Sequence, residues 1–208
     1  MISIALTKGR LQKKTMELLE KCGYGTEALK DPGRALVLYD TKKDVRYYLV
    51  KAHDAITYVE HGVADAAVVG KDTLMEGGSD YYEMLDLNIG RCRFILGALE
   101  GQNPLLQTGH VRIGTKYPNV ARNYFQSKGM DVEIIRIEGS VELSPVLGLC
   151  DGIVDITETG TTLKENGLVV CDTVAEISAR VIVNKASYKM KREEVIRLIN
   201  DLKGVIPC

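Results

Sequence analysis

Short apolar runs recur along the chain and alternate with segments whose apolar residues repeat at helical spacing. An apolar run of strand length that is bounded by turn residues is typical of a buried β-strand. By this criterion the sequence predicts strands at 2–6, 35–40, 46–51, 66–69, 91–98, 111–115, 132–137, 151–157, 168–174 and 179–183.

The segments between these runs supply the helices. One helix opens at Lys8-Gly9-Arg10 and ends at Gly23, because glycine readily adopts the left-handed conformation that closes a helix. The last helix, 192–203, places Val195, Leu198, Ile199 and Leu202 on one face. Further helices are expected to end at 57–61, to span 119–128, and to run from the turn after 157 to Gly167.

Strands that alternate with helices predict an α/β fold. Two such sets of elements, joined by strands that cross between them, predict two lobes with a cleft between them. We expect lobe I to comprise residues 1–90 plus 175–208 and lobe II to comprise residues 91–174.

Composition narrows the classes of function. The 208 residues carry a formal net charge of −1, so no basic field indicates a nucleic-acid partner. No apolar run reaches membrane-spanning length, and the N-terminus lacks a basic leader, so we expect a cytoplasmic protein. The five cysteines are scattered and the three histidines are far apart, so neither a disulfide framework nor a metal site is predicted.

The most informative stretch for function is 138–168. An apolar strand at 151–157 is followed by the hydroxyl residues Thr159, Thr161 and Thr162 around Gly160, and then by a helix. A strand, a small polar turn and a helix N-terminus together present unpaired backbone N–H groups, and such an arrangement binds phosphate. The alternative, a threonine-capped helix without a ligand, stays open on this pattern alone.

Two acids sharpen the interpretation of this turn. Asp155 and Glu158 would repel a free phosphate, but they suit the hydroxyls of a sugar or a metal ion. A sugar phosphate therefore fits better than inorganic phosphate.

Elsewhere, Arg34 in a turn is either a solvated residue or a cation for a polyphosphate. Lys71 and Asp72 follow a strand end, where ligands gather in open α/β sheets, although they are also an ordinary helix start.

Motifs that are spread in order over nearly the whole chain carry a family resemblance. They are LTKGR at 6–10, DPGR at 31–34, YVEHGVAD at 58–65, VGKD at 69–72, EGSVELSP at 138–145 and DITETGTTL at 155–163. This set closely resembles the ATP phosphoribosyltransferases, which open histidine biosynthesis. The resemblance implies a two-lobed fold like that of periplasmic binding proteins, with the active site in the cleft between the lobes.

The resemblance also implies the reaction and the site. N1 of ATP attacks C1 of phosphoribosyl pyrophosphate, and pyrophosphate leaves with Mg²⁺ held mainly by substrate oxygens. Arg10 and Arg34 match the positions that touch substrate phosphates. The phosphoribosyl pyrophosphate site is expected at Asp155, Glu158, Thr159, Gly160, Thr161 and Thr162. Second-rank candidates, including those for ATP, are Lys8, Gly9, Lys71, Asp72, Ser140 and Glu142.

The chain resembles the short form of this family, because it ends directly after the last predicted helix and lacks a histidine-binding tail. The resemblance then implies a homodimer within a hetero-oligomer that contains a regulatory subunit related to histidyl-tRNA synthetase. Two rival hypotheses stay open: a two-lobed module that binds a small anion without catalysis, and a phosphoribosyltransferase for another base.

Overall fold

The computed structural model describes residues 1–40 and 42–206, and the chain divides into two compact units. Unit 1 comprises Met1–Gly90 and Ser178–Cys208, and unit 2 comprises Arg91–Ile177. The second crossing between the units therefore lies at 177/178, three residues beyond the 174/175 position expected from the sequence. Thr41, between the predicted strands 35–40 and 46–51, and the last two residues of the expected lobe I lie outside the described residues.

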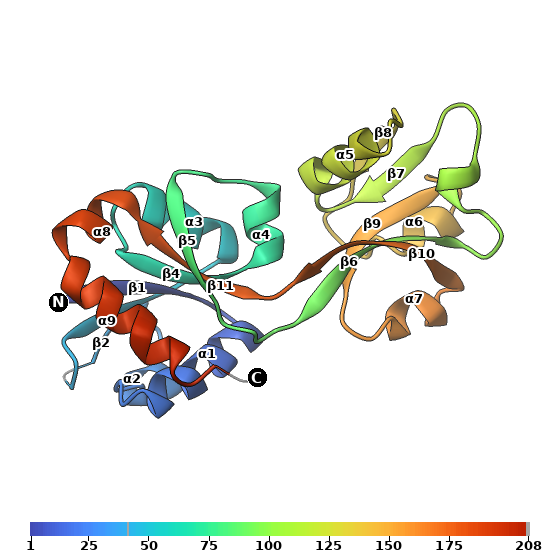
Figure 1. Cartoon of the computed structure of the whole chain (residues 1–208). Coiled ribbons are helices and arrows are strands. Elements are labelled where there is room, and N and C mark those ends of the chain that lie inside the picture. The colour runs from blue at the N-terminus through green and yellow to red at the C-terminus, as the bar shows by residue number, and fades with distance from the viewer. Residues whose placement is uncertain (41, 207–208) are drawn as a thin grey trace. The chain divides into compact units, whose positions relative to one another are not determined.

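Unit 1 is built on a six-stranded mixed sheet (Figure 1). The strand order is β2 (Val37–Asp40), β3 (Val45–Val50), β1 (Ile2–Thr7), β4 (Ala66–Gly70), β11 (Ala179–Asn184) and β5 (Tyr81–Asp86). The central strands β3, β1 and β4 are parallel, whereas β2, β11 and β5 pair antiparallel with their neighbours. The carboxyl ends of the three parallel strands consequently share one edge of the sheet.

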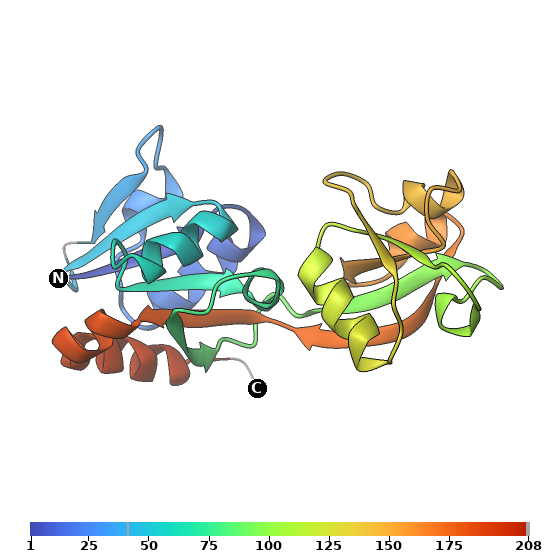
Figure 2. The same ribbon diagram turned by 90° about the horizontal axis from the view of Figure 1, so that it is seen from above.

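Helices cover both faces of this sheet. On one face, α1 (Arg10–Lys21) and α9 (Arg192–Lys203) pack Leu18, Leu19 and Leu198 against β1 and its neighbours. On the other face, α3 (Ala52–Glu60) and α4 (Lys71–Glu76) enclose a smaller cluster that includes Val59 and Leu74. The short helices α2 (Glu27–Lys30) and α8 (Lys185–Met190) complete the unit. The layers on the two faces are visible in Figure 2.

A buried carboxylate ties several of these elements together. Asp65 is 3% exposed, and its oxygens accept hydrogen bonds from the backbone N–H and the hydroxyl of Ser3, both at 2.8 Å. The hydroxyl of Ser187 donates at 2.7 Å, and the Lys191 Nζ lies 2.8 Å from the nearer oxygen. Burial alone would raise the pKa of Asp65, but these donors outweigh it and hold the pKa below its usual value.

Unit 2 contains a five-stranded mixed sheet. The order is β10 (Leu168–Ile177), β6 (Cys92–Leu99), β9 (Gly152–Thr157), β7 (Arg112–Thr115) and β8 (Glu133–Arg136). Strands β9, β7 and β8 are parallel, so their carboxyl ends again share an edge. β6 runs antiparallel to β9, and β10 pairs antiparallel with β6 through two register shifts.

The two faces of the second sheet carry different helices (Figure 1). On one face, α5 (Pro118–Ser127) buries Val120, Ala121, Tyr124 and Phe125, as its sequence periodicity predicts. On the other face, α6 (Leu143–Val146) and α7 (Thr161–Glu165) pack near β9, where Leu163 joins Ile95 and Ile153 in one cluster. A 3₁₀ turn, η1 (Pro104–Leu106), lies between β6 and β7.

The predicted α/β fold is confirmed, and most elements agree with their predicted bounds within one to three residues. The helix at 192–203 begins and ends where expected. Helices α2, α6 and α8 were not predicted, because four to six residues give too few repeats for a helical period to be recognised. Among the described residues, no helix is both long and apolar enough to cross a membrane.

Asp65→Asn should destabilise unit 1. The amide retains one acceptor but leaves the Lys191 ammonium without its carboxylate, so we expect the free energy of unfolding at pH 7 to fall by about 2–4 kcal/mol. Because the Asp65 pKa is lowered by folding, its contribution is present above the unfolded pKa and is lost as the pH falls through the folded value. Urea unfolding at pH 7 and at acidic pH measures both effects, with the exposed Asp31→Asn as control. Equal stability of the two variants would contradict this role.

Candidate functional site

The predicted phosphate turn forms in unit 2 at the carboxyl end of β9. The strand ends at Thr157, and Gly160 adopts the left-handed conformation with φ 79° directly before α7. The Gly160 N–H donates to the Thr157 hydroxyl at 2.8 Å, and the Thr159 and Thr161 hydroxyls lie 2.9 Å apart. The residues from β9 to α7 therefore fold into a compact turn that three threonine hydroxyls hold together.

The surface of this turn is open. Thr159, Thr161 and Thr162 are exposed, and a Cβ built on Gly160 would meet no heavy atom within 4 Å. Glycine is required here by the positive φ, and the vacant space lets a ligand approach the backbone closely. Because α7 has only five residues, its dipole contributes little, so hydroxyl and backbone donors must supply most of any attraction for phosphate.

The acids beside the turn occupy different environments. Glu158 is exposed, whereas Asp155 is half-buried at the end of β9 and accepts the backbone N–H of Ile156 at 2.8 Å. Burial raises the pKa of Asp155 to about 6; the nearby Glu142 carboxylate adds to the shift, and Lys116 opposes it. Asp155 can therefore change its charge close to physiological pH, where a ligand hydroxyl or cation would favour the ionised form.

The parallel strands bring three sequence segments to the edge where this turn lies. Lys116 follows β7, and Ser140 and Glu142 lie in the segment after β8. The predicted candidates Ser140 and Glu142 thus share an edge with the β9 turn. Lys116 was not among the predicted site residues, although it is a lone basic residue directly after an apolar strand, the same pattern that identified Lys71.

In unit 1, the remaining candidates other than Arg34 follow the carboxyl ends of β1 and β4, and Arg34 lies in the turn before β2. Strands β1 and β4 pair in parallel, so Lys8-Gly9-Arg10 and Lys71-Asp72 lie at the same edge. Lys8 and Arg34 line one hollow of about 420 Å³, together with Gln12 and the 32–36 turn. Arg10 begins α1 but does not line this hollow. Two of the predicted cations are therefore adjacent.

Lys71 and Asp72 are already engaged in local contacts. The Lys71 Nζ lies 2.6 Å from Glu83 Oε2, and both side chains are about one-third exposed. The Asp72 carboxylate lies over Gly70, where a Cβ would collide with it. As predicted for the simpler alternative, the pair also begins a helix, α4. A substrate would have to compete with Glu83 for the Lys71 ammonium.

Cys150 is packed inside unit 2. It is 4% exposed, and its Sγ lies 3.0 Å from the Ser144 hydroxyl, beneath the surface of α6. Among the described residues, no group of three or more His, Cys, Asp and Glu side chains is arranged to hold a metal ion. Protein side chains of this part of the chain do not form a ready-made metal cage.

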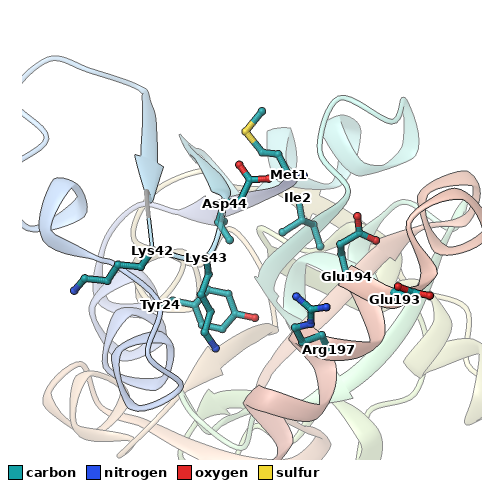
Figure 3. A pocket seen from close by; sticks show the side chains of 10 residues that line it. Met1, Ile2, Tyr24, Lys42, Lys43, Asp44, Glu193, Glu194 and Arg197 are labelled. Atoms are coloured by element: carbon teal, nitrogen blue, oxygen red, sulfur yellow. Dashed lines mark ion pairs between the residues drawn. The ribbon is translucent and has the colours of Figure 1, made fainter.

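A second hollow in unit 1, of about 540 Å³, contains none of the predicted site residues (Figure 3). It lies at the amino ends of β1 and β3, opposite the edge that carries Lys8. Several of its charges are satisfied locally: Lys43 pairs with Asp201 at 2.9 Å, and the Met1 amino group pairs with Asp44 at 2.7 Å. We therefore place the candidate site at the carboxyl edges instead.

The fold and the donors at these edges define an α/β protein that is suited to bind phosphorylated sugars. The family model described as ATP phosphoribosyltransferase (HisG) matches residues 51–204. A curated ATP phosphoribosyltransferase of Clostridium acetobutylicum is 53% identical over 205 residues, which cover 99% of this chain and 95% of the relative. The chain belongs to the ATP phosphoribosyltransferase family, so the predicted family and enzyme class are confirmed.

Solved structures agree with this assignment. The structure titled as the ATP phosphoribosyl transferase (HisG:HisZ) complex from Thermotoga maritima matches with a TM-score of 0.84 and 39% identity, covering 99% of this chain and 98% of that chain. The periplasmic aliphatic sulphonate binding protein SsuA of Escherichia coli matches with a TM-score of 0.57 and 11% identity, covering 99% and 75%. At this low identity the second match shows the fold alone, and it confirms the predicted periplasmic-binding-protein-like class.

Asp155→Asn should stabilise the ligand-free protein at pH 8 and not at pH 4. The folded state raises the Asp155 pKa to about 6, so ionisation of this group above pH 6 costs folding free energy. We expect a gain on the order of 1–3 kcal/mol at pH 8 that shrinks as the pH falls through 6 and vanishes near 4. Urea unfolding across this pH range, with the exposed Asp131→Asn as control, measures the difference. A gain independent of pH would contradict the shifted pKa.

Proposed function

We propose that the chain transfers the 5-phosphoribosyl group from phosphoribosyl pyrophosphate to N1 of ATP and releases pyrophosphate, the first step of histidine biosynthesis. The observation that carries this proposal is the turn after β9, where a left-handed Gly160 and three threonines lie beside Asp155. A sugar phosphate needs donors for its phosphate and acceptors for its hydroxyls, and this turn offers both within a few residues.

In this proposal the turn holds the phosphoribosyl donor. Residues 158–162 cradle the 5-phosphate with backbone N–H and hydroxyl groups, and Asp155 and Glu158 accept hydrogen bonds from the ribose hydroxyls. The empty space beside the Cα of Gly160 supports this assignment because a phosphate oxygen can approach the backbone there without a steric clash. Ser140 and Glu142 share the strand edge and are second-rank contacts.

The cations of unit 1 supply the charge that the reaction requires. As the bond to pyrophosphate breaks, negative charge grows on the leaving group and C1 gains oxocarbenium character, so fixed donors lower the barrier. Arg10 and Arg34 are proposed to bind the pyrophosphate and the ATP phosphates. Lys8 supports Arg34 because both line one hollow, and Gly9, Lys71 and Asp72 are second-rank candidates for the ATP side.

Mg²⁺ is the proposed cofactor. It would neutralise pyrophosphate charge, and it usually keeps oxygen ligands from substrate phosphates and water. We propose that the substrate oxygens hold most of this ion, as the family resemblance implies. Asp155 and Glu158 are the acids of the proposed donor site.

We also propose that the chain works in the cytoplasm, as a homodimer within a hetero-oligomer that contains a regulatory subunit related to histidyl-tRNA synthetase. The related Thermotoga maritima structure is described as a HisG:HisZ complex, and this chain covers 98% of the matched chain. The partner can change activity only if it binds different conformations of the catalytic chain with different affinity.

The test of this function is pyrophosphate release from ATP and phosphoribosyl pyrophosphate, with identification of the nucleotide product. The purified chain should form N1-(5-phosphoribosyl)-ATP and should not respond to histidine, whereas the complex with the regulatory subunit should be inhibited by histidine. Substitution of other bases for ATP is the specificity control. Binding without product, or product with another base, would replace the proposed reaction. Strong histidine inhibition of the isolated chain would contradict the role of the partner.

Gly160→Val should weaken binding of phosphoribosyl pyrophosphate by about 10-fold or more, because a β-branched residue is strained at φ 79° and its side chain occupies the space for phosphate. Gly167→Val is the matched control: Gly167 has φ 73° and equally open surroundings, but it lies beyond the far end of α7. Isothermal titration calorimetry measures both affinities. Equal losses in the two variants would show that strain in α7, and not the turn itself, is responsible.

A further inference from the structure

Arg93 lies next to the proposed phosphate turn, although no motif of the sequence points to it. In the antiparallel pairing of β6 with β9, Arg93 is directly opposite Thr157, and Ile95 is opposite Asp155. Thr157 is the residue whose hydroxyl accepts the Gly160 N–H. Arg93 is therefore one strand away from the residue that shapes the turn.

The Arg93 side chain lies on the same face of the sheet as the turn. Directly opposed residues of antiparallel strands share a face, and alternate residues of one strand do so as well. Ile95 packs with Leu163 of α7 in one cluster, which identifies this face as the one that α7 covers. Arg93, Asp155 and Thr157 consequently all project on the α7 side of the sheet.

The Arg93 Nε is buried and makes no hydrogen bond within the described part of the chain. No ion pair of Arg93 is found there either. Other arginines of unit 2 are paired: Arg112 with Asp151 at 3.3 Å and Arg136 with Glu138 at 2.7 Å. A buried donor without a partner is costly, so the Arg93 Nε needs an explanation, and a ligand is one such explanation.

The acidic side chains at this edge indicate why a phosphate bound here would need a nearby cation. Asp155, Glu158 and Glu142 make the surroundings of the turn acidic, and burial with Glu142 raises the Asp155 pKa. A dianionic phosphate would be repelled here unless a cation lay close by. Lys116 is exposed and is not buried in the edge, whereas Arg93 is half-buried and forms part of the sheet. A guanidinium also matches phosphate oxygens better than an ammonium does.

We infer that Arg93 binds the 5-phosphate of the phosphoribosyl donor and offsets the carboxylates around it. The inference rests on the proposed function and adds a residue to its donor site. Arg93 is a binding residue: it holds the donor in the turn while Asp155 and Glu158 hold the ribose.

A purely structural role offers a distinct expectation. Glu176 of β10 is opposite Arg93 on its other side, and a cross-strand ion pair could form between them in solution. That pair would make the two residues interdependent in thermal stability and would leave ligand affinity unchanged. The two roles can therefore be separated by measuring stability and binding on the same variants.

The experiment measures the affinities of the full chain for phosphoribosyl pyrophosphate, ribose 5-phosphate and ATP by calorimetry. Arg93→Met should raise the Kd for both phosphoribosyl ligands by about 10- to 100-fold, while the Kd for ATP changes less than about 2-fold. Arg93→Lys should recover part of the loss. Arg46→Met is the matched control, because Arg46 is a half-buried strand arginine of unit 1 whose Nε is also buried and unpartnered.

The outcomes separate the inference from the function it rests on. If the wild-type chain binds neither phosphoribosyl ligand, the proposed function fails. If the wild type binds and Arg93→Met binds equally well, only the assignment of Arg93 is wrong. Loss of affinity for phosphoribosyl pyrophosphate alone would place Arg93 on the pyrophosphate and overturn the 5-phosphate contact. Unchanged affinity with non-additive melting temperatures of Arg93→Met and Glu176→Gln would show the cross-strand pair instead.

Discussion

The buried charge of Asp65 is the constraint on which unit 1 depends. A carboxylate that is 3% exposed must be fully compensated, and its donors come from β1, α8 and the residue before α9. These segments are far apart in sequence, so the charge fixes how the last helices meet the first strand. Asp65 directly precedes β4, which pairs with β1 in parallel. The candidate residues after β1 and β4 share an edge because these two strands are parallel.

In unit 2 the equivalent constraint is a backbone conformation. The left-handed Gly160 turns the chain out of β9 into α7, and Leu163 then anchors α7 on the sheet. Because the anchor is apolar and the turn is polar, packing and ligand binding are served by different residues of the same short segment. The raised pKa of Asp155 has burial of the strand end as its main cause.

The sequence predicted the elements whose periodicity is long and regular, such as α9, α5 and the buried strands. It also identified the turn at 157–162, because glycine and threonine there have local conformational meaning. It could not reveal that Asp65 is a structural hub, since the donors Ser187 and Lys191 are more than 120 residues away. The environment of Asp155 and the position of Arg93 depend on strand register, which no local pattern in a single sequence specifies.

The register shifts in β10 affect how the protein behaves at high concentration. β10 is an edge strand, and its residues Val169 and Val170 are 41% and 40% accessible. A long, regular edge with valines of this kind would be a template for strand addition between molecules. The irregularities between Val170 and Asp172 and between Thr173 and Ala175 break the strand into short pieces, so an incoming strand would find no continuous ladder. The backbone irregularities of β10 thus oppose strand addition at this edge.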